Sequence, residues 1–309
     1  MHIGLVLLLV EDPPSGRPSR WDELQAMSLV AEEIGFDTVW IPDELLWRPA
    51  DWPGPRGWWE CVAIAGAVAA STRRVKVGTW ILSALHRNPA LTAKVATTLD
   101  EITGGRFVLG LGTGHAGTQA EAFGFPMDHV YGRFEEAFRI MLPLLREGRA
   151  DFDGTYHRAK DLELRPLGPQ GTRIPILLGA RGPKMLRIAA EHADIWSWYA
   201  GDTSDPEQFV PMLADLDRAC EEIGRDPASI GRSVGIVVEP TDRSGAAEHG
   251  MGVPIRGSAE EIAAALASFA TIGITRIETM LWPGDLASVE AMGPVLDALG
   301  PEAAAPSAT

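Results

Sequence analysis

Strand-like and helix-like segments alternate along the whole chain, and this alternation restricts the fold more than any other feature. Short, mainly apolar runs typical of buried β-strands occupy 3–10, 38–41, 75–82, 106–111, 174–178, 193–198, 233–238 and 274–281. Segments with apolar residues at spacings of three and four, typical of α-helices, occupy 22–34, 58–70, 89–102, 131–146, 183–192, 206–223, 258–272 and 286–299. A closed barrel needs eight strands, each followed by a helix, so the sequence predicts an α/β fold of the (β/α)8 TIM barrel class.

Three connections are longer than ordinary loops and fall at 42–57, 151–173 and 239–257. In a (β/α)8 barrel the loops after the strands build the active site, so we expect 42–57 and 239–257 to be insertions at the barrel mouth. The connection at 151–173 follows a helix instead, which predicts a hairpin at the opposite face or the edge. One barrel accounts for residues 1–300, the expected single catalytic domain, and leaves 301–309 as a flexible C-terminal tail.

The net charge and the cysteines limit which binding partners and which cellular compartment we expect for the protein. The formal net charge of −15 argues against nucleic acid or an anionic membrane as a partner, since both would repel an acidic protein. Cys61 and Cys220 lie far apart without metal or redox spacing, and no apolar run reaches the length of a membrane span. The histidines show no paired spacing, so no metal site is predicted. We expect a cytoplasmic protein that acts on a small molecule, and the sequence leaves a monomer and a homodimer open.

A glycine-rich turn, Gly112-Thr113-Gly114, follows the fourth predicted strand and leads into His115. Residues without a Cβ allow backbone amides to approach a ligand closely, so this turn is a candidate edge of an active site. It does not match the dinucleotide-binding fingerprint, because the next predicted helix begins only at Tyr131. The alternative interpretation is that the glycines only make a tight turn.

A second glycine-rich turn, GARGPK at 179–184, follows the fifth predicted strand. Pro183 takes the first position of the next helix, which leaves free backbone amides and the positive end of the helix directed at whatever lies there. This arrangement favours a phosphate group as ligand. The alternative interpretation is an ordinary helix start with Arg181 and Lys184 in solvent.

Four segments in this order, 36–43, 87–94, 105–114 and 179–184, resemble the luciferase-like monooxygenase superfamily of flavin- and deazaflavin-dependent oxidoreductases. The resemblance extends over 3–299 and implies a bacterial luciferase-like TIM barrel, with the ring of FMN or coenzyme F420 standing in the barrel mouth. The deazaflavin branch of that family often has a non-proline cis peptide bond, which maps here to Trp80-Ile81. The cofactor-binding residues that the resemblance implies are Asp43, Trp80, Ile81, Gly112, Thr113, Gly114, His115, Gly179, Ala180, Arg181, Gly182 and Pro183.

One departure from the family pattern concerns the catalytic residues. The sugar-phosphate dehydrogenases of the family have a His after the Asp of the second strand and a Glu after the glycine turn of the fourth. Here the two residue types are exchanged, because Glu44 follows Asp43 and His115 follows Gly114. A Glu and a His can both be tuned to exchange protons near neutral pH, so Glu44 and His115 are the predicted catalytic pair. The alternative is a solvated Glu44 and a His115 that is only hydrogen-bonded beside the cofactor.

The resemblance implies an oxidoreductase that transfers a hydride between bound coenzyme F420 and a small organic substrate. Arg181, Lys184 and Arg87 are then the cations expected to meet the acidic tail of the coenzyme. FMN is the alternative cofactor and would make the protein a monooxygenase, and a barrel that binds flavin without turnover is a further alternative. A metal-free hydrolase would instead use two carboxylates, Glu44 and Glu278.

Overall fold

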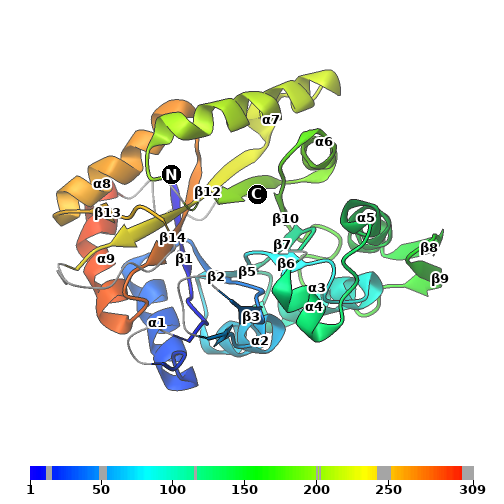
Figure 1. The fold of residues 1–309 in the computed structure, drawn as a ribbon, viewed down its shortest axis with the longest axis horizontal. Helices are drawn as coiled ribbons and strands as arrows, with labels where there is room; N and C mark the ends of the chain where they lie inside the picture. Colours follow the sequence, from blue (N-terminus) through cyan, green and yellow to red (C-terminus); the bar gives the residue numbers. More distant parts are fainter. Residues whose placement is uncertain are drawn as a thin grey trace.

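Eight parallel strands close into a barrel in the computed structural model, which describes residues 1–11, 16–48, 54–114, 117–199, 201, 203–241 and 252–300 (Figure 1). The strands pair in sequence order, and the last closes the ring against the first. They are β1 (His2–Val6), β2 (Thr38–Ile41), β5 (Lys76–Thr79), β7 (Phe107–Gly112), β10 (Ile176–Gly179), β11 (Ile195–Tyr199), β12 (Gly231–Glu239) and β14 (Arg276–Leu281). The predicted TIM barrel is confirmed, and two short strands, β6 (Leu82–Ser83) and β13 (Ile255–Arg256), extend it beside β7 and β12.

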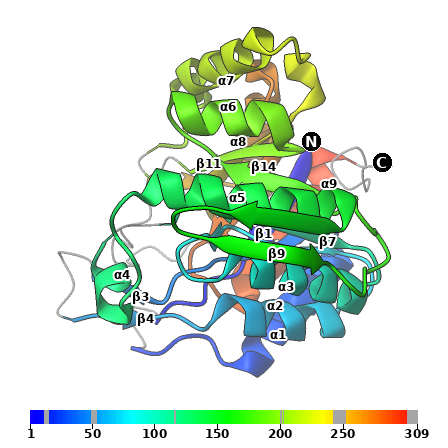
Figure 2. The same cartoon turned by 90° about the vertical axis from the view of Figure 1, so that its right-hand side faces the viewer.

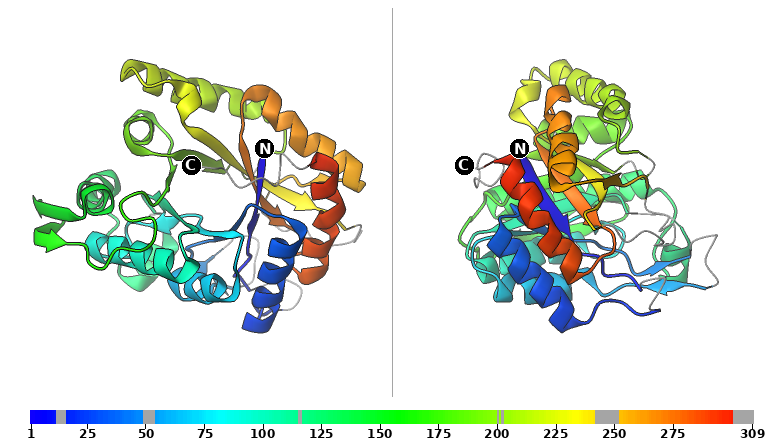
Figure 3. Two further views of the ribbon diagram at one scale, coloured as in Figure 1. Left: turned by 180° about the vertical axis from the view of Figure 1, so that it is seen from behind. Right: turned by 90° about the vertical axis from the view of Figure 1, so that its left-hand side faces the viewer.

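Helices cover the outside of the barrel on all sides (Figures 1 and 3). They are α1 (Trp21–Ile34), α2 (Cys61–Ser71), α3 (Pro89–Thr103), α5 (Val130–Glu147), α6 (Pro183–His192), α7 (Val210–Glu222), α8 (Ala259–Ser268) and α9 (Leu286–Leu299), with single 3-10 turns η1 (Pro206–Phe209), η2 (Pro227–Ser229) and η3 (Phe269–Ile272). Local sequence fixes their ends: Asn88 caps the first amides of α3, and Gly104 ends it in the left-handed conformation. No described helix combines the length and the hydropathy that a bilayer span requires.

The predicted insertions contain short elements of their own. After β2, the strands β3 (Leu46–Trp47) and β4 (Arg56–Gly57) pair antiparallel. They lie beside α4 (Thr118–Phe123), a short helix in the stretch before Tyr131, where no helix was predicted (Figure 2). The predicted hairpin after α5 is formed by β8 (Arg149–Asp153) and β9 (Arg158–Glu163) and lies along the outer side of that helix. Most of the insertion after β12, and the predicted tail at 301–309, lie outside the described residues.

The apolar side chains of the strands divide into an outer and an inner core. Outward-facing residues such as Val39 and Leu109 pack under the helices. The inner core fills the barrel with Val6, Leu8, Trp40, Val108, Leu177, Val237, Met280 and Trp282. The Trp40 indole takes the space above Gly4 and Gly78, where an added Cβ would lie 2.4 Å and 2.3 Å from its ring atoms. These two glycines are therefore required by a side chain of the barrel interior.

Charged side chains fill the end of the barrel at which the strands begin. Arg276 donates through Nη2 to Oδ2 of Asp37 at 2.6 Å and through Nε to Oε1 of Glu278 at 3.4 Å. Lys76 Nζ also donates to Asp37 at 3.4 Å, and His2 Nδ1 lies 3.1 Å from the same carboxylate. Burial alone would raise the pKa of Asp37, but His2, Arg276 and Lys76 outweigh it and hold that pKa well below its ordinary value. The barrel is thus closed at this end by a buried ionic cluster.

Candidate active site

The predicted site residues lie at the C-terminal ends of β7 and β10 and on the loops that follow β2, β5, β7 and β10. Because the strands are parallel, their C-terminal ends share one end of the barrel, and the loops after them form its mouth. His115 lies outside the described residues, whereas the other predicted site residues lie within them. Among the described residues, His, Cys, Asp and Glu side chains form no group of three that could hold a metal ion.

Asp43, directly after β2, holds the loop that follows β6. Its side chain is buried, and its two oxygens accept a bidentate pair of hydrogen bonds from Arg87 at 2.6 Å and 2.9 Å. The backbone N–H of Ser83 donates to the same carboxylate at 2.8 Å, and Nδ1 of His86 lies 3.3 Å from it. Burial opposes the charge, but His86 and Arg87 outweigh it and keep the pKa of Asp43 below its ordinary value. Asp43 is therefore a charged residue that joins two mouth loops.

Arg87 is fully engaged on the inner side of the mouth. Besides Asp43 it contacts Glu60, whose Oε1 accepts from Nη2 at 2.5 Å, and its side chain is 13% exposed. Because its guanidinium already binds two carboxylates, the expected contact of Arg87 with the acidic tail of a coenzyme stays a prediction without further support. Glu60 also caps α2 by accepting the N–H of Ala63 at 2.7 Å.

Glu44 lies in the mouth and is held by α4. The Nε2 of Gln119 donates to Oε2 of Glu44, and Oε1 of Gln119 accepts the backbone N–H of Leu45 at 2.9 Å. Gln119 is 5% exposed, so this contact is an internal one. It joins the loop after β2 to the segment after β7, which carries His115 four residues before Gln119. No local pattern marks Gln119 as a site residue, because its partners lie more than seventy positions away.

The peptide bond between Trp80 and Ile81 is cis, as the resemblance implied. The Ile81 side chain lies between two of the predicted cofactor-binding glycines: an added Cβ at Gly112 or Gly179 would lie 2.4 Å or 2.3 Å from its Cδ1. At Gly114, which has a φ of 85°, an added Cβ would lie 2.0 Å from Oγ of Ser83. At these three glycines we expected a ligand to approach the backbone, but the side chains of Ile81 and Ser83 occupy the space that a Cβ would take. Their contact with a cofactor stays a prediction.

Gly182 differs from those glycines because the space above it is open. It has a φ of 75°, and nothing lies within 4 Å of the position that a Cβ would take. It is the residue that precedes α6, Pro183 follows as the first helical residue, and no side chain caps the helix. Uncapped amides at the positive end of a helix are suited to an anion. Phosphate binding at this turn stays a prediction.

A cavity of about 390 Å³ lies beside this turn, lined in part by Arg181, Trp198, Tyr199 and Thr203. The Arg181 guanidinium stacks over the Trp198 ring at 5.2 Å from its centroid, which is cation–π distance. Lys184 lies 4.9 Å from the ring centroid of Tyr131. Arg181 and Lys184 therefore remain the cations near the turn.

Glu278 lies in the middle of β14 and is completely buried. Its Oε1 accepts from Ser233 at 2.9 Å and from Arg276, and burial raises its pKa although Arg276 opposes the shift. Because it lies inside the barrel, the metal-free hydrolase that would pair Glu44 with Glu278 at the mouth finds no support.

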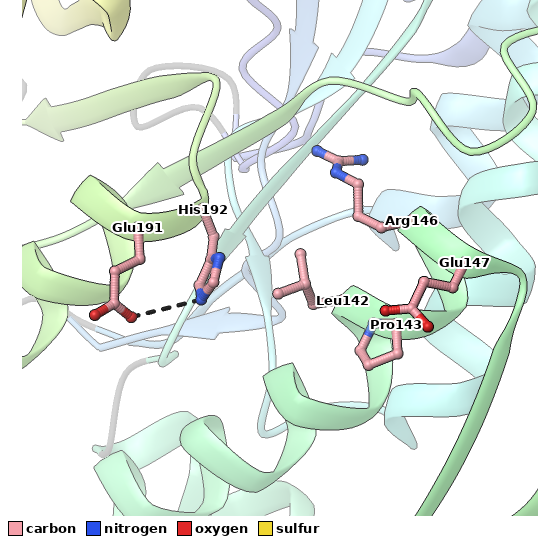
Figure 4. A pocket seen from close by; sticks show the side chains of 6 residues that line it. All are labelled: Leu142, Pro143, Arg146, Glu147, Glu191 and His192. Atoms are coloured by element: carbon pink, nitrogen blue, oxygen red, sulfur yellow. Dashed lines mark ion pairs between the residues drawn. The ribbon is translucent and has the colours of Figure 1, made fainter. Parts of the chain in front are cut away.

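A second cavity, of about 300 Å³, lies between α5 and α6 (Figure 4). Leu142, Arg146 and Glu147 line it from α5, and Glu191 and His192 from α6. Helices of a (β/α)8 barrel run opposite to its strands, so these helix ends lie at the end of the barrel remote from the mouth. Arg146 is bound there to Asp194 at 3.0 Å. This cavity is separate from the candidate site.

Comparison with known proteins identifies the family. A model of the luciferase-like monooxygenase family matches residues 1–290. The chain belongs to the luciferase-like monooxygenase family. Among solved structures, an F420-dependent secondary alcohol dehydrogenase in complex with an F420-acetone adduct has the same fold: the TM-score is 0.79, with 20% identity, and 96% of this chain and 98% of that one are covered.

Curated members of the family are more similar in sequence. The 5,10-methylenetetrahydromethanopterin reductase of Archaeoglobus fulgidus is 32% identical over 206 residues, which are 67% of this chain and 57% of that protein. The F420-dependent glucose-6-phosphate dehydrogenase of Microbacterium testaceum is 33% identical over 210 residues, 66% of this chain and 60% of that protein. The chain thus spans about three fifths of the length of these curated relatives.

Proposed function

We propose that residues 1–300 act as one catalytic domain, an oxidoreductase that transfers a hydride between bound coenzyme F420 and a small organic substrate. The observation that carries this proposal is the open, uncapped turn at Gly182 and Pro183, beside the cavity lined by Arg181, at the mouth of a barrel of this family. Relatives named as F420-dependent dehydrogenases support the choice of cofactor. Two buried free cysteines, Cys61 and Cys220, fit a protein of the cytoplasm. A homodimer stays a prediction.

The residues present fit such a cofactor at its phosphate end. The amides that begin α6, with Gly179 to Pro183 before them, would hold the phosphate, and Arg181 and Lys184 would face the acidic tail. When bound, the deazaflavin supplies a carbon centre that accepts and donates hydride but reacts poorly with oxygen. Trp80, Ile81 and the turn at 112–114 would lie against the ring, and Asp43 would hold the loop after β6 in place through Arg87 and Ser83.

Glu44 would move the proton that accompanies hydride transfer. Its carboxyl group is held by Gln119 in the mouth, so its position is fixed before substrate binds. We propose His115 as its partner, in the reverse order to the sugar-phosphate dehydrogenases of the family. The pair supplies the one acid and one base that reversible oxidation of an alcohol or reduction of a carbonyl requires.

A flavin-dependent monooxygenase is the second candidate function. The pyrimidine monooxygenase of Agrobacterium fabrum is 32% identical over 233 residues, 72% of this chain, which makes it as similar as the F420-dependent relatives. Titration of the apoprotein with coenzyme F420 and with FMN, followed by fluorescence quenching, separates the two. We expect tight binding of F420 and weak binding of FMN. A yellow protein with one FMN per chain and oxygen-consuming turnover would move the function to the monooxygenase, and binding of either cofactor without any turnover would favour a non-catalytic barrel.

Gly182→Val is expected to weaken F420 binding by at least about tenfold, because the side chain would enter the open space before α6 and remove contacts to a charged group, which contribute about 1.5–3 kcal/mol each. Gly224→Val is the matched control: Gly224 also has a positive φ, 72°, and open space around it, but it follows α7 away from the mouth. Both variants place a β-branched residue at a positive φ. Equal F420 affinity in the two would contradict the phosphate assignment.

A further inference from the structure

A chain of hydrogen bonds connects the mouth of the barrel to its interior. The indole Nε1 of Trp80, at the end of β5, donates to Oγ of Ser197 on β11 at 2.9 Å. Ser197 Oγ donates to Oγ of Ser233 on β12 at 3.4 Å, and Ser233 donates to Oε1 of Glu278 on β14 at 2.9 Å. The two hydroxyls are 2% and 0% exposed. Three strands of the barrel and the segment after β5 thus contribute one residue each to a single polar path.

The Trp80 indole reaches across the barrel to make this contact. In the order of the strands, β5 and β12 lie on opposite sides of the ring. An added Cβ at Gly235 on β12 would nevertheless lie 2.4 Å from Cη2 of the indole. Tyr199, at the end of β11, meets the same ring edge to face, with centroids 6.0 Å apart. The indole therefore forms the floor of the mouth, between the loops above and the inner core below.

Along this path of hydrogen bonds, each donor donates to the next residue in the direction of Glu278. A buried hydroxyl without a partner destabilises a fold, so serines inside an apolar barrel are retained only where their hydrogen bonds are made. The serines provide a fixed acceptor for the indole N–H of Trp80. This acceptor favours a single orientation of the Trp80 ring.

We propose that Ser197, Ser233 and Glu278 are positioning residues, which hold the Trp80 indole as the floor against which the ring of the bound cofactor lies. The cofactor part of this inference rests on the proposed function. The positioning of the indole does not, because it concerns contacts within the chain. The two parts can be measured separately.

The first experiment uses the protein without cofactor. The chain has ten tryptophans, so ¹⁵N-indole NMR gives a small set of Nε1–H signals, and the Trp80 signal is the one that Trp80→Phe removes. In Ser197→Ala and Ser233→Ala this proton is expected to exchange with solvent at least about tenfold faster. Ser28→Ala is the matched control, since Ser28 is also fully buried and its hydroxyl donates to Leu24 in α1. Unchanged exchange in both test variants would overturn the proposal.

The second experiment measures F420 affinity and turnover in a double-mutant cycle. Ser197→Ala and Ser233→Ala are each expected to weaken F420 binding about three- to tenfold, the range for loss of one hydrogen bond. In the Trp80→Phe background, which lacks the indole donor, Ser197→Ala should have no further effect. Glu278→Gln keeps an oxygen acceptor for Ser233, so the Trp80 indole proton of this variant should exchange with solvent at the wild-type rate. Additive losses in the cycle would show that the serines act on packing alone and would overturn the proposal.

The two experiments distinguish the two claims. Faster indole exchange in a protein that binds neither F420 nor FMN would support the positioning of Trp80 and refute the proposed function. Normal F420 binding with unchanged indole exchange would support the proposed function and refute the positioning of Trp80.

Discussion

Arg276→Met is expected to lower the free energy of unfolding by about 3–5 kcal/mol, because it leaves two buried carboxylates without their shared cation. Arg276 is 5% exposed and contacts both Asp37 and Glu278, while Lys76 reaches Asp37 only at 3.4 Å. Urea unfolding at pH 7, followed by circular dichroism, measures the loss. Arg218→Met is the control, since Arg218 forms an exposed ion pair with Asp215 on α7, and such pairs contribute little.

The pH dependence of this loss gives an independent test. The pKa of Asp37 is lowered in the folded protein, so its ion pair stabilises the fold above the ordinary Asp pKa of about 3.9 and ceases to do so as pH falls through the lower folded value. The difference between wild type and Arg276→Met should therefore be full near neutral pH and shrink below about pH 4. A difference of under about 1 kcal/mol at pH 7 would mean that solvent or Lys76 satisfies Asp37 without Arg276.

Glu44→Gln is expected to reduce kcat by about 10² to 10⁴, the range for loss of a general acid or base, with little change in F420 affinity. Glutamine keeps an oxygen that can accept from Gln119, so the loop after β2 should retain its position. Steady-state kinetics with a candidate alcohol or aldehyde and direct F420 titration measure the two effects. Glu121→Gln is the control, because Glu121 is an exposed carboxylate on α4 at the same end of the barrel.

His115→Ala completes this test. A similar loss of kcat in the two single variants, with no further loss in the double variant, is expected of a pair that acts as one unit. Wild-type turnover in both single variants would show that Glu44 and His115 are structural. The F420 assignment would be unaffected, since it depends on the turn before α6.

The barrel could be predicted from the sequence because its constraints are local. Outward-facing strand residues such as Val39 and Ile277 must be apolar to pack under helices, and Asn88 and Gly104 mark helix ends by their own chemistry. The turn at Gly182 was predicted for the same reason, since a glycine before a first-turn proline is a local signal. Such features need no knowledge of which strands become neighbours.

The contacts that organise the mouth could not be predicted in this way. Trp80 and Ser197 are 117 positions apart, and a single serine in a strand carries no pattern. The turn at Gly112 looked like a ligand-approach site because the side chain that fills its space, Ile81, comes from the segment between β5 and β6. Asp43 was predicted to approach the cofactor, and its internal partner Arg87 lies 44 positions away. Pairings of this kind follow from strand order and register, which a single sequence does not display.

The hydrogen bonds of Arg87 to Asp43 and Glu60 have a consequence for how the loop after β2 can vary among related enzymes. The two carboxylates lie at either end of the insertion after β2, and both accept hydrogen bonds from the same guanidinium. A loop whose ends are pinned can grow, shrink or change composition at small entropic cost, because that cost rises only slowly with length. The part of the insertion that follows Glu44 can therefore change in length or composition at small entropic cost, while Arg87 keeps Asp43 and Glu60 in place.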